Sequence, residues 1–435
     1  MGGYLPGTER ERRDMLAALG LSSADELFAA LPEGVRLKGL SLPEGLSQQG
    51  VERRVRALAA ENTVYPTILR GAGAERHFIP AIVNEVASRE VFVTAYTPYQ
   101  PEISQGVLQS IFEYQSMVCD LYDMDVANAS VYDGASAAAE AASMCRERAR
   151  VRVLASGAMN PRYAGTVRTY AAGRPVDEIP LADGRTDARA LKNMLGADAA
   201  CVLIQQPNYF GLIEDLSELT EIAHAAGAKL AVVYHPLAAA LYRTPGECGC
   251  DIAVGEGQPL GLPLAAGGPY LGYMAATEKH MRKLPGRIVG ETTDDEGRRA
   301  YVLSLQAREQ HIRREKAGSN ICSNEALCAL TAGLYMAAMG PDGMAQAARQ
   351  SMAKAHYLAD ALCAIDGVKL RYSGAFFHEF VTDMPKTEEV LSALSRAGIL
   401  GGLSVEGGIL WCATEKVTKA ALDKTAAIVK EVLAK

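Results

Sequence analysis

The chain has 435 residues, of which 49% are hydrophobic and 22% are charged, and its formal net charge is −7. This is the composition of an ordinary globular protein with room for two or three domains. The sequence has no basic tail, no apolar run near the roughly 18 residues of a membrane helix and no secretory signal, so nucleic-acid binding and membrane insertion are not expected.

The N-terminal region combines helical patterns with frequent proline and glycine. Residues 22–31 begin with a serine that an acidic residue follows three positions later, which is typical of a capped helix start. We expect residues 1–90 to form an arm and helices rather than a domain. An amphipathic helix is predicted from near Glu102, and a second helix, rich in small residues, follows a glycine turn at residue 134.

Short apolar strands then alternate with amphipathic helices. The predicted strands comprise residues 200–206, 229–234, 251–254 and 269–276. This alternation predicts a mostly parallel sheet covered on both faces, in a large α/β domain of residues 91–320. Residues 321–435 read as long helices followed by three strands and a last helix, which predicts a smaller α+β domain.

A segment rich in tyrosine, glutamine and proline, residues 94–106, precedes the first long helix. It is either a rigid polar connection in which prolines fix the helix entry, or the lining of a cleft. In the second case the candidate residues are Tyr96, Thr97, Tyr99, Gln100 and Glu102.

A basic segment occupies residues 308–320. Its charged residues are Arg308, His311, Arg313, Arg314 and Lys316. They form either a solvated helical face or a surface that grips carboxylate or phosphate groups. Both interpretations stay open at this point.

The glycine-rich loop 255–268 stands between two predicted strands, where a pyridoxal phosphate enzyme would carry its Schiff-base lysine. Gln258 occupies that position, and His235 stands 23 residues earlier at the strand end where such an enzyme places an acidic residue. Glutamine forms no imine and histidine is no fixed anion. The nearest lysines, Lys229 and Lys279, lie outside the loop.

No metal site is expected from the sequence. Cys248 and Cys250 lack the two-residue gap usual for zinc, the seven histidines are scattered, and the remaining cysteines follow no recurring spacing. Reduced cysteines suit a cytoplasmic location.

Several long motifs resemble the glycine-cleavage P protein family. They include TAYTPYQPEISQG, GEGQPLGLPLAAGGPYLGYMAA and AREQHIRREKAGSNICSNEAL, and the resemblance extends over nearly the whole chain. It implies the fold of type I pyridoxal phosphate enzymes, which is similar to that of aspartate aminotransferase. It also implies subunit 1 (alpha) of a glycine dehydrogenase (decarboxylating) that is split into two subunits.

In that family the heteromer decarboxylates glycine, releases CO₂ and passes the aminomethyl group to the lipoyl arm of the H protein. The resemblance implies that pyridoxal phosphate is carried by the beta subunit and not covalently by this chain. It further implies an α₂β₂ assembly and a functional link to the T and L proteins.

The resemblance also bears on single residues. It places the candidates of residues 94–106 in a cleft shared with the partner, and lets His311, Arg313 and Arg314 face that cleft or the acidic H protein. Two residues depart from the family pattern: His235 stands where relatives often keep an aspartate, and Arg76 stands where many have an acidic residue. Two other functions stay open, a purely structural or regulatory subunit and a self-sufficient pyridoxal enzyme that uses another lysine.

Overall fold

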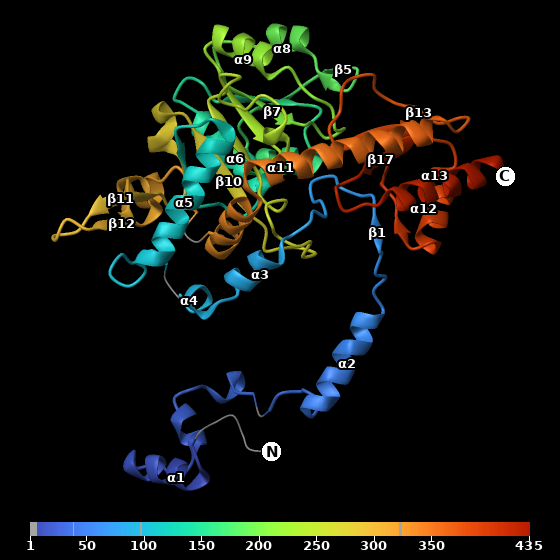
Figure 1. The fold of residues 1–435 in the computed structure, drawn as a ribbon. Coiled ribbons are helices and arrows are strands. Elements are labelled where there is room, and N and C mark those ends of the chain that lie inside the picture. Colours follow the sequence, from blue (N-terminus) through green and yellow to red (C-terminus); the bar gives the residue numbers. More distant parts are fainter. Residues whose placement is uncertain (1–6, 38, 96–97, 322–323) are drawn as a thin grey trace. The chain divides into compact units, whose positions relative to one another are not determined.

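A computed structural model describes most of the chain in two units, Met1–Thr63 and Val64–Lys435 (Figure 1). The described residues are 7–37, 39–95, 98–321 and 324–435. Two of the predicted site residues, Tyr96 and Thr97, therefore lie outside the described residues.

The first unit consists of four short helices. They are α1 (Glu9–Ala18), η1 (Ala24–Phe28), η2 (Glu33–Val35) and α2 (Gln48–Ala60). The helix start predicted near residue 22 is the 3₁₀ helix η1, which begins after Ser23 with a capping box to Glu26. None of these helices contains a buried residue in the part of the unit that the structure describes. The described part of this unit thus has no hydrophobic core of its own.

The second unit is built on a seven-stranded sheet. Its strands, in order across the sheet, are β2 (Val126–Ala127), β10 (Gly272–Ala276), β9 (Ile252–Glu256), β8 (Lys229–Tyr234), β7 (Ala199–Gln206), β3 (Arg152–Ser156) and β4 (Val176–Ile179). Neighbours from β9 to β4 are parallel, whereas β10 is antiparallel to both β9 and β2. The sheet is therefore mostly parallel, as the sequence predicts.

Helices cover this sheet on both faces. They include α5 (Gln105–Tyr122), α6 (Gly134–Cys145), α7 (Pro161–Ala171), α8 (Ala188–Met194) and α9 (Leu216–Ala225). Helix α3 (Ala81–Ala87) packs against α11 (Ala326–Cys363) instead, and the short helix α4 (Glu90–Val93) follows it in the chain. Strand β8 shows why both faces are apolar: Leu230, Val232 and Tyr234 belong to one core cluster. The residues between them, Ala231 and Val233, belong to the other cluster.

Smaller elements connect the sheet to the C-terminal region. They are β5 (Leu181–Ala182), β6 (Arg185–Thr186), η3 (Ala238–Ala240), η4 (Glu278–Lys283), the hairpin β11 (Val289–Thr293) and β12 (Arg299–Leu303), η5 (Gln306–Arg308), α10 (Gln310–Arg313) and η6 (Arg314–Lys316). The helix expected near Glu102 begins at Gln105, with Ser104 as its N-cap.

The C-terminal region holds a second, antiparallel sheet. It has the order β13 (Lys369–Leu370), β14 (Glu379–Asp383), β17 (Gly408–Cys412) and β16 (Leu403–Val405), and packs with α12 (Thr387–Arg396) and α13 (Lys419–Ala434). Helix α11 (Ala326–Cys363) contacts α5 and α3 of the large part as well as α13 and β14 of the small one (Figure 1). It bends at Gly340, which has a non-helical φ of 60° and precedes Pro341.

A strand from the start of this unit completes the C-terminal region. Strand β1 (Thr67–Ile68) pairs in parallel with β15 (Ile399–Leu400), so the segment that follows β1 lies beside the small sheet. The eight cysteines that the structure describes are free thiols. Within the described ranges, no helix combines the length and apolarity that crossing a membrane requires.

Candidate functional site

The carboxyl ends of the parallel strands form the place where an α/β sheet of this kind binds its ligand. Gln206 ends β7, His235 follows β8 and Glu256 ends β9. A cavity of about 50 Å³ at this edge is lined by these three residues together with Glu75 and His378, among others. The cavity is small because side chains of the chain itself fill the edge.

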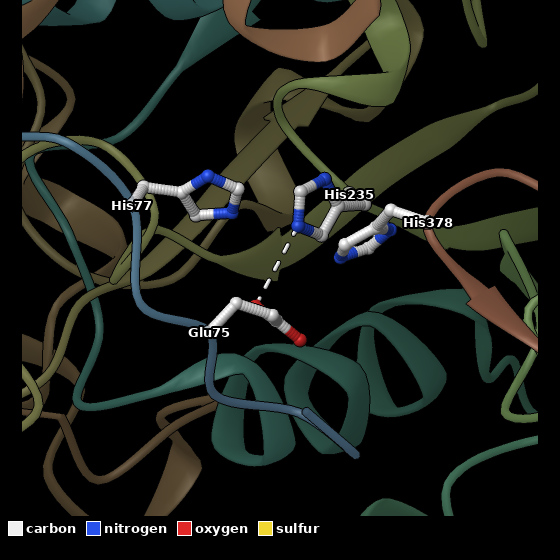
Figure 2. Close-up of side chains that lie close together, drawn as sticks. All are labelled: Glu75, His77, His235 and His378. Atoms are coloured by element: carbon white, nitrogen blue, oxygen red, sulfur yellow. Dashed lines mark ion pairs between the residues drawn. The ribbon is translucent and has the colours of Figure 1, made fainter. Parts of the chain in front are cut away.

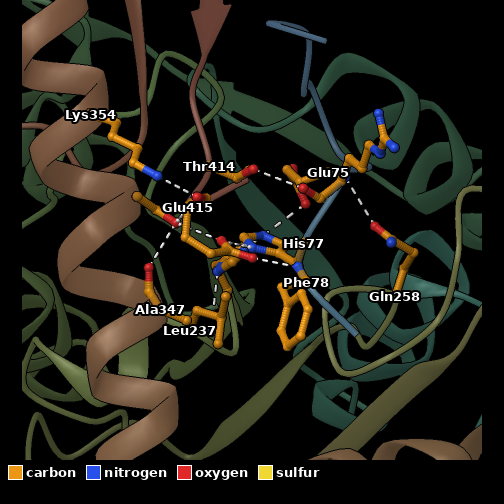
Figure 3. Close-up of polar contacts among 12 residues, drawn as sticks. Glu75, His77, Phe78, Leu237, Gln258, Ala347, Lys354, Thr414 and Glu415 are labelled. Atoms are coloured by element: carbon orange, nitrogen blue, oxygen red, sulfur yellow. Dashed lines mark hydrogen bonds and ion pairs between the residues drawn. The ribbon is translucent and has the colours of Figure 1, made fainter. Parts of the chain in front are cut away.

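Gln258 is a buried structural residue in this edge. Its Oε1 accepts a hydrogen bond from the Glu75 backbone N–H at 2.9 Å (Figure 3). Its Nε2 donates to the Leu262 carbonyl at 2.8 Å. The side chain is 1% exposed. Gln258 therefore holds the segment around Glu75 across the ends of β8 and β9.

Glu256 occupies the N-terminus of α6, where the backbone N–H groups of a helix attract an anion. Its carboxyl group accepts hydrogen bonds from the N–H groups of Gly134 at 3.0 Å, Gln258 at 2.9 Å and Leu271 at 3.2 Å. A Cβ at Gly134 would lie 2.7 Å from the Tyr163 hydroxyl and 2.9 Å from the Glu256 backbone nitrogen, so glycine is required for this close approach. Burial raises the pKa of Glu256 to about 8, against the opposing effect of these hydrogen bonds.

A cluster of three histidines and one glutamate lies beside Gln258. Figure 2 shows Glu75 and His77 from the segment after β1, His235 from the end of β8, and His378 from the residue before β14. One ligand-type atom of each lies within 4.8 Å of the others. The His235 Nε2 is 3.6 Å from the Glu75 Oε2.

The charges in this cluster follow from burial and from close partners. Burial acts to raise the pKa of Glu75, but the nearby His235 and His77 outweigh it and hold that pKa below its usual range. Burial, with the charges of His235 and His77, lowers the pKa of His378 well below its usual value. The cluster therefore combines an ionised carboxylate with a neutral imidazole.

Glu415 contacts the cluster through His77 (Figure 3). Its carboxylate accepts hydrogen bonds from His77 Nδ1 at 2.8 Å, from Ser351 Oγ at 3.0 Å and from the Phe78 N–H. Burial opposes ionisation, but the His77 contact and the backbone bonds lower the pKa of Glu415 to about 2. The Lys354 ammonium group donates to the Glu415 carbonyl.

Both lysines nearest to Gln258 in the sequence lie at the opposite edge of the sheet. Lys229 begins β8 and pairs with Glu147 at 2.7 Å. Lys279 pairs with Asp251, the residue before β9, at 2.6 Å. Five further residues of strand, about 17 Å, separate Lys229 from the carboxyl end of β8, so it does not reach the cavity.

The residues at this edge do not fit pyridoxal phosphate. Gln258 cannot form the imine, the Glu256 carboxyl group already occupies the helix N-terminus that would hold a phosphate, and the remaining space is about 50 Å³. His235 cannot provide a fixed anion to a pyridinium nitrogen. This edge is therefore a pocket that the chain's own side chains fill, and we refer to it as the filled pocket.

Tyr99 anchors a second group of residues, away from the filled pocket. Its hydroxyl donates to Asn324 Oδ1 at 2.5 Å, and the Arg287 guanidinium lies 5.4 Å from the centre of its ring. Arg287 also forms an ion pair with Glu309, whose carboxylate is 3.8 Å from His311 Nδ1. Burial raises the pKa of Tyr99 to about 12. The structure thus brings Tyr99 and the start of the basic segment together.

The basic segment folds as short helical turns that border two cavities. Arg313 lines one of about 280 Å³, together with Arg282, Lys283, Arg308 and Lys316. His311 and Arg314 line another of about 330 Å³, together with Arg287. Arg308 is engaged by the carbonyl groups of Leu284 and Gly286. Basic side chains of this segment therefore line both cavities.

Other predicted residues are on the surface. Gln100 and Glu102 are exposed, as are the side chains of Arg313 and Arg314. Sequence reasoning did not identify Glu75, His77, His378 and Glu415, nor Arg287. These residues are brought together from distant segments, and the local spacing around each gives no signal of the others.

Comparison with known proteins decides the family. Residues 2–429 match the glycine cleavage system P-protein family. The chain belongs to this P-protein family. It is 48% identical to the "probable glycine dehydrogenase (decarboxylating) subunit 1" of Moorella thermoacetica, over 99% of this chain and 100% of that protein. It is 47% identical to the protein of the same name from Desulfitobacterium hafniense, over 99% of each chain.

Solved structures confirm the predicted fold of this P-protein family member. A crystal structure of glycine decarboxylase (P-protein) of the glycine cleavage system, in inhibitor-bound form, matches with a TM-score of 0.93 and 42% identity, over 99% of this chain and 100% of that one. A sphingosine-1-phosphate lyase from Burkholderia pseudomallei matches with a TM-score of 0.66 and 14% identity, over 94% of each, which shows the fold alone. The fold is that of type I pyridoxal phosphate enzymes.

Proposed function

We propose that this chain is the alpha subunit of a heteromeric glycine decarboxylase whose beta subunit carries pyridoxal phosphate. The observation that carries the proposal is the filled pocket: Gln258 and Glu256 occupy the positions that an imine-forming lysine and a phosphate group would need. A chain with this fold that cannot hold the cofactor needs a partner that does. The full-length similarity to proteins named subunit 1 supports the same conclusion.

The heteromer would decarboxylate glycine, release CO₂ and transfer the aminomethyl group to the lipoyl arm of the H protein. Its product would pass to the T and L proteins. An α₂β₂ assembly and a cytoplasmic location, both predicted from the sequence, are part of this proposal.

The role of this chain would be to shape a shared site from the group around Tyr99. Arg287, His311 and Arg314 line one cavity there. Arg313 and five further basic side chains line the neighbouring cavity. A surface of this charge would attract the glycine carboxylate or an acidic carrier protein. Tyr99 is held by Asn324 and Arg287, which gives its ring and hydroxyl a fixed direction.

The N-terminal unit supports a heteromeric assembly. It exposes large apolar side chains, among them Leu27, Phe28 and Leu31, each more than half exposed. Exposed apolar groups of this number, on helices without buried residues, fit a surface that is covered by a partner.

The test is reconstitution with the beta subunit encoded by the same organism. The two chains should co-purify, and glycine-dependent CO₂ exchange in the presence of H protein should require both. Exchange by the beta subunit alone, at the full rate, would show that this chain is a structural or regulatory subunit.

The alternative of a self-sufficient pyridoxal enzyme, which binds the cofactor through another lysine of this chain, makes a separate prediction. If this chain used another lysine, such as Lys354 near Glu415, the purified chain mixed with pyridoxal phosphate would show imine absorbance, and borohydride would fix the cofactor to one lysine. We expect neither, because Lys354 is engaged by the Glu415 carbonyl and the pocket is filled.

A further inference from the structure

Several polar atoms of the histidine cluster are buried without a hydrogen-bond partner. Among the described residues, none provides a hydrogen bond to Nε2 of His77, Nε2 of His235 or either ring nitrogen of His378. Glu75, His77 and His378 are each 2–4% exposed. Buried polar atoms in folded proteins are almost always satisfied, so the unpartnered nitrogens of His77 and His378 point to a ligand between them.

The hydrogen bonds around His77 set the direction of its free lone pair. The Glu415 carboxylate, which also accepts the Phe78 N–H, lies 2.8 Å from His77 Nδ1, so His77 Nδ1 is the donor of this hydrogen bond. The lone pair of a neutral His77 is then on Nε2, which faces the cluster. A carboxylate behind a histidine in this way is the usual second shell of a metal-binding histidine.

His235 has a different role in the cluster. The Leu237 N–H donates to its Nδ1 at 3.2 Å, so the ring proton of the neutral form is on Nε2, on the side of Glu75. At 3.6 Å this N–H lies just beyond hydrogen-bond distance of the carboxylate. His235 is thus placed to orient Glu75 rather than to bind a cation itself.

We propose that Glu75, His77 and His378 bind a divalent transition-metal ion, with Zn²⁺ as the best match, and that His235 positions the Glu75 carboxylate. Two imidazoles and one carboxylate form a donor set that Zn²⁺ accepts, with a water molecule as fourth ligand. The cavity of about 50 Å³ lined by Glu75, His235 and His378 has room for that water. The proposal is independent of the proposed function.

The geometry needs a modest contraction. Tetrahedral ligands at about 2.0–2.1 Å from zinc lie about 3.4 Å apart, whereas the ligand-type atoms here lie within 4.8 Å of one another. Side-chain shifts of about 1 Å would close the difference. The sequence gives no sign of the site, because Glu75 and His77 are separated from His378 by about 300 residues. The ion would join the segment after β1 to the small sheet.

The experiment uses the full chain, purified without a polyhistidine tag, stripped with EDTA and titrated with Zn²⁺ in a calorimeter. We expect one Zn²⁺ ion per chain and a rise in Tm on binding. Glu75→Gln and His378→Asn should each weaken the affinity by about 100-fold or more. His311→Asn, which removes an exposed histidine outside the cluster, is the matched control and should bind Zn²⁺ like the parent chain.

X-ray absorption of the parent chain gives a readout that needs no variant. It should show nitrogen and oxygen ligands about 2.0–2.1 Å from zinc, with imidazole scattering. The proposal would be overturned if the stripped chain bound no Zn²⁺. It would also be overturned if Glu75→Gln and His378→Asn, shown to be folded by circular dichroism, bound Zn²⁺ as tightly as His311→Asn.

Discussion

Restoring a lysine at the position of Gln258 tests whether the pocket is filled or merely lacks one residue. In Gln258→Lys the new side chain can still donate to the Leu262 carbonyl, but it cannot accept the Glu75 N–H, which now bonds Oε1 at 2.9 Å. A buried N–H without an acceptor costs about 1–3 kcal/mol. The ammonium group at a position that is 1% exposed adds a desolvation cost, so we expect a total destabilisation of about 2–4 kcal/mol.

The variant should also fail to bind pyridoxal phosphate. Glu256 would still occupy the N-terminus of α6, and the segment at Glu75 would still fill the edge. Thermal unfolding measures the destabilisation, and visible absorbance with borohydride trapping measures imine formation. Gln258→Met is the matched control, since it removes both hydrogen bonds without adding a charge, and it should be destabilised less. A Gln258→Lys chain that keeps the parent Tm and forms an imine at position 258 would refute the reasoning.

Three further predictions concern charge, assembly and the shared site. The folded-state pKa of Glu256 is raised to about 8 from an ordinary 4.5, so the folded chain keeps a proton that the unfolded chain loses, and stability should fall as the pH rises through this range. The resulting loss of unfolding free energy is at most about 1.4 kcal/mol per pH unit. Glu256→Gln should therefore show a weaker dependence of Tm on pH between 5 and 8 than the parent chain, and an equal dependence in both chains would contradict this. Deleting residues 1–63 should leave the Tm of the Val64–Lys435 unit nearly unchanged but abolish co-purification with the beta subunit, and undiminished capture would count against the role of the arm. Tyr99→Phe removes the bond to Asn324 and should cost about 1 kcal/mol in stability, yet lower exchange activity of the reconstituted enzyme about tenfold or more; unchanged activity would exclude Tyr99 from the shared site.

The sheet could be predicted because each of its main strands is a short run of apolar residues that is recognisable in the local sequence. Residues 229–234 are apolar on both sides of the strand, and the structure buries both sides beneath helices. Helix starts were less well placed: the helix expected near Glu102 begins three residues later, after Ser104. The position of a helix start depends on contacts that the hydrophobic periodicity of the sequence does not encode. One of them is the Gln105 side chain, which donates to the carbonyl groups of Pro101 and Tyr301.

The candidate site was predictable only where one sheet edge defines it. His235 and Gln258 follow adjacent parallel strands, so their spacing was enough to single them out. His77, His378 and Glu415 come from the segment after β1 and from the small C-terminal part, and they meet because β1 pairs with β15. That pairing joins residues more than 300 positions apart, and nothing in a local window of sequence announces it.

The Glu256 carboxyl group has a consequence for how the two kinds of subunit mature. It accepts hydrogen bonds from three backbone N–H groups, one of them at the N-terminus of α6, where a phosphate group could otherwise bind. This edge of the sheet can therefore form without pyridoxal phosphate. In the proposed heteromer, a shortage of vitamin B6 would then leave folded alpha chains ready to assemble as soon as cofactor-loaded beta subunits appear.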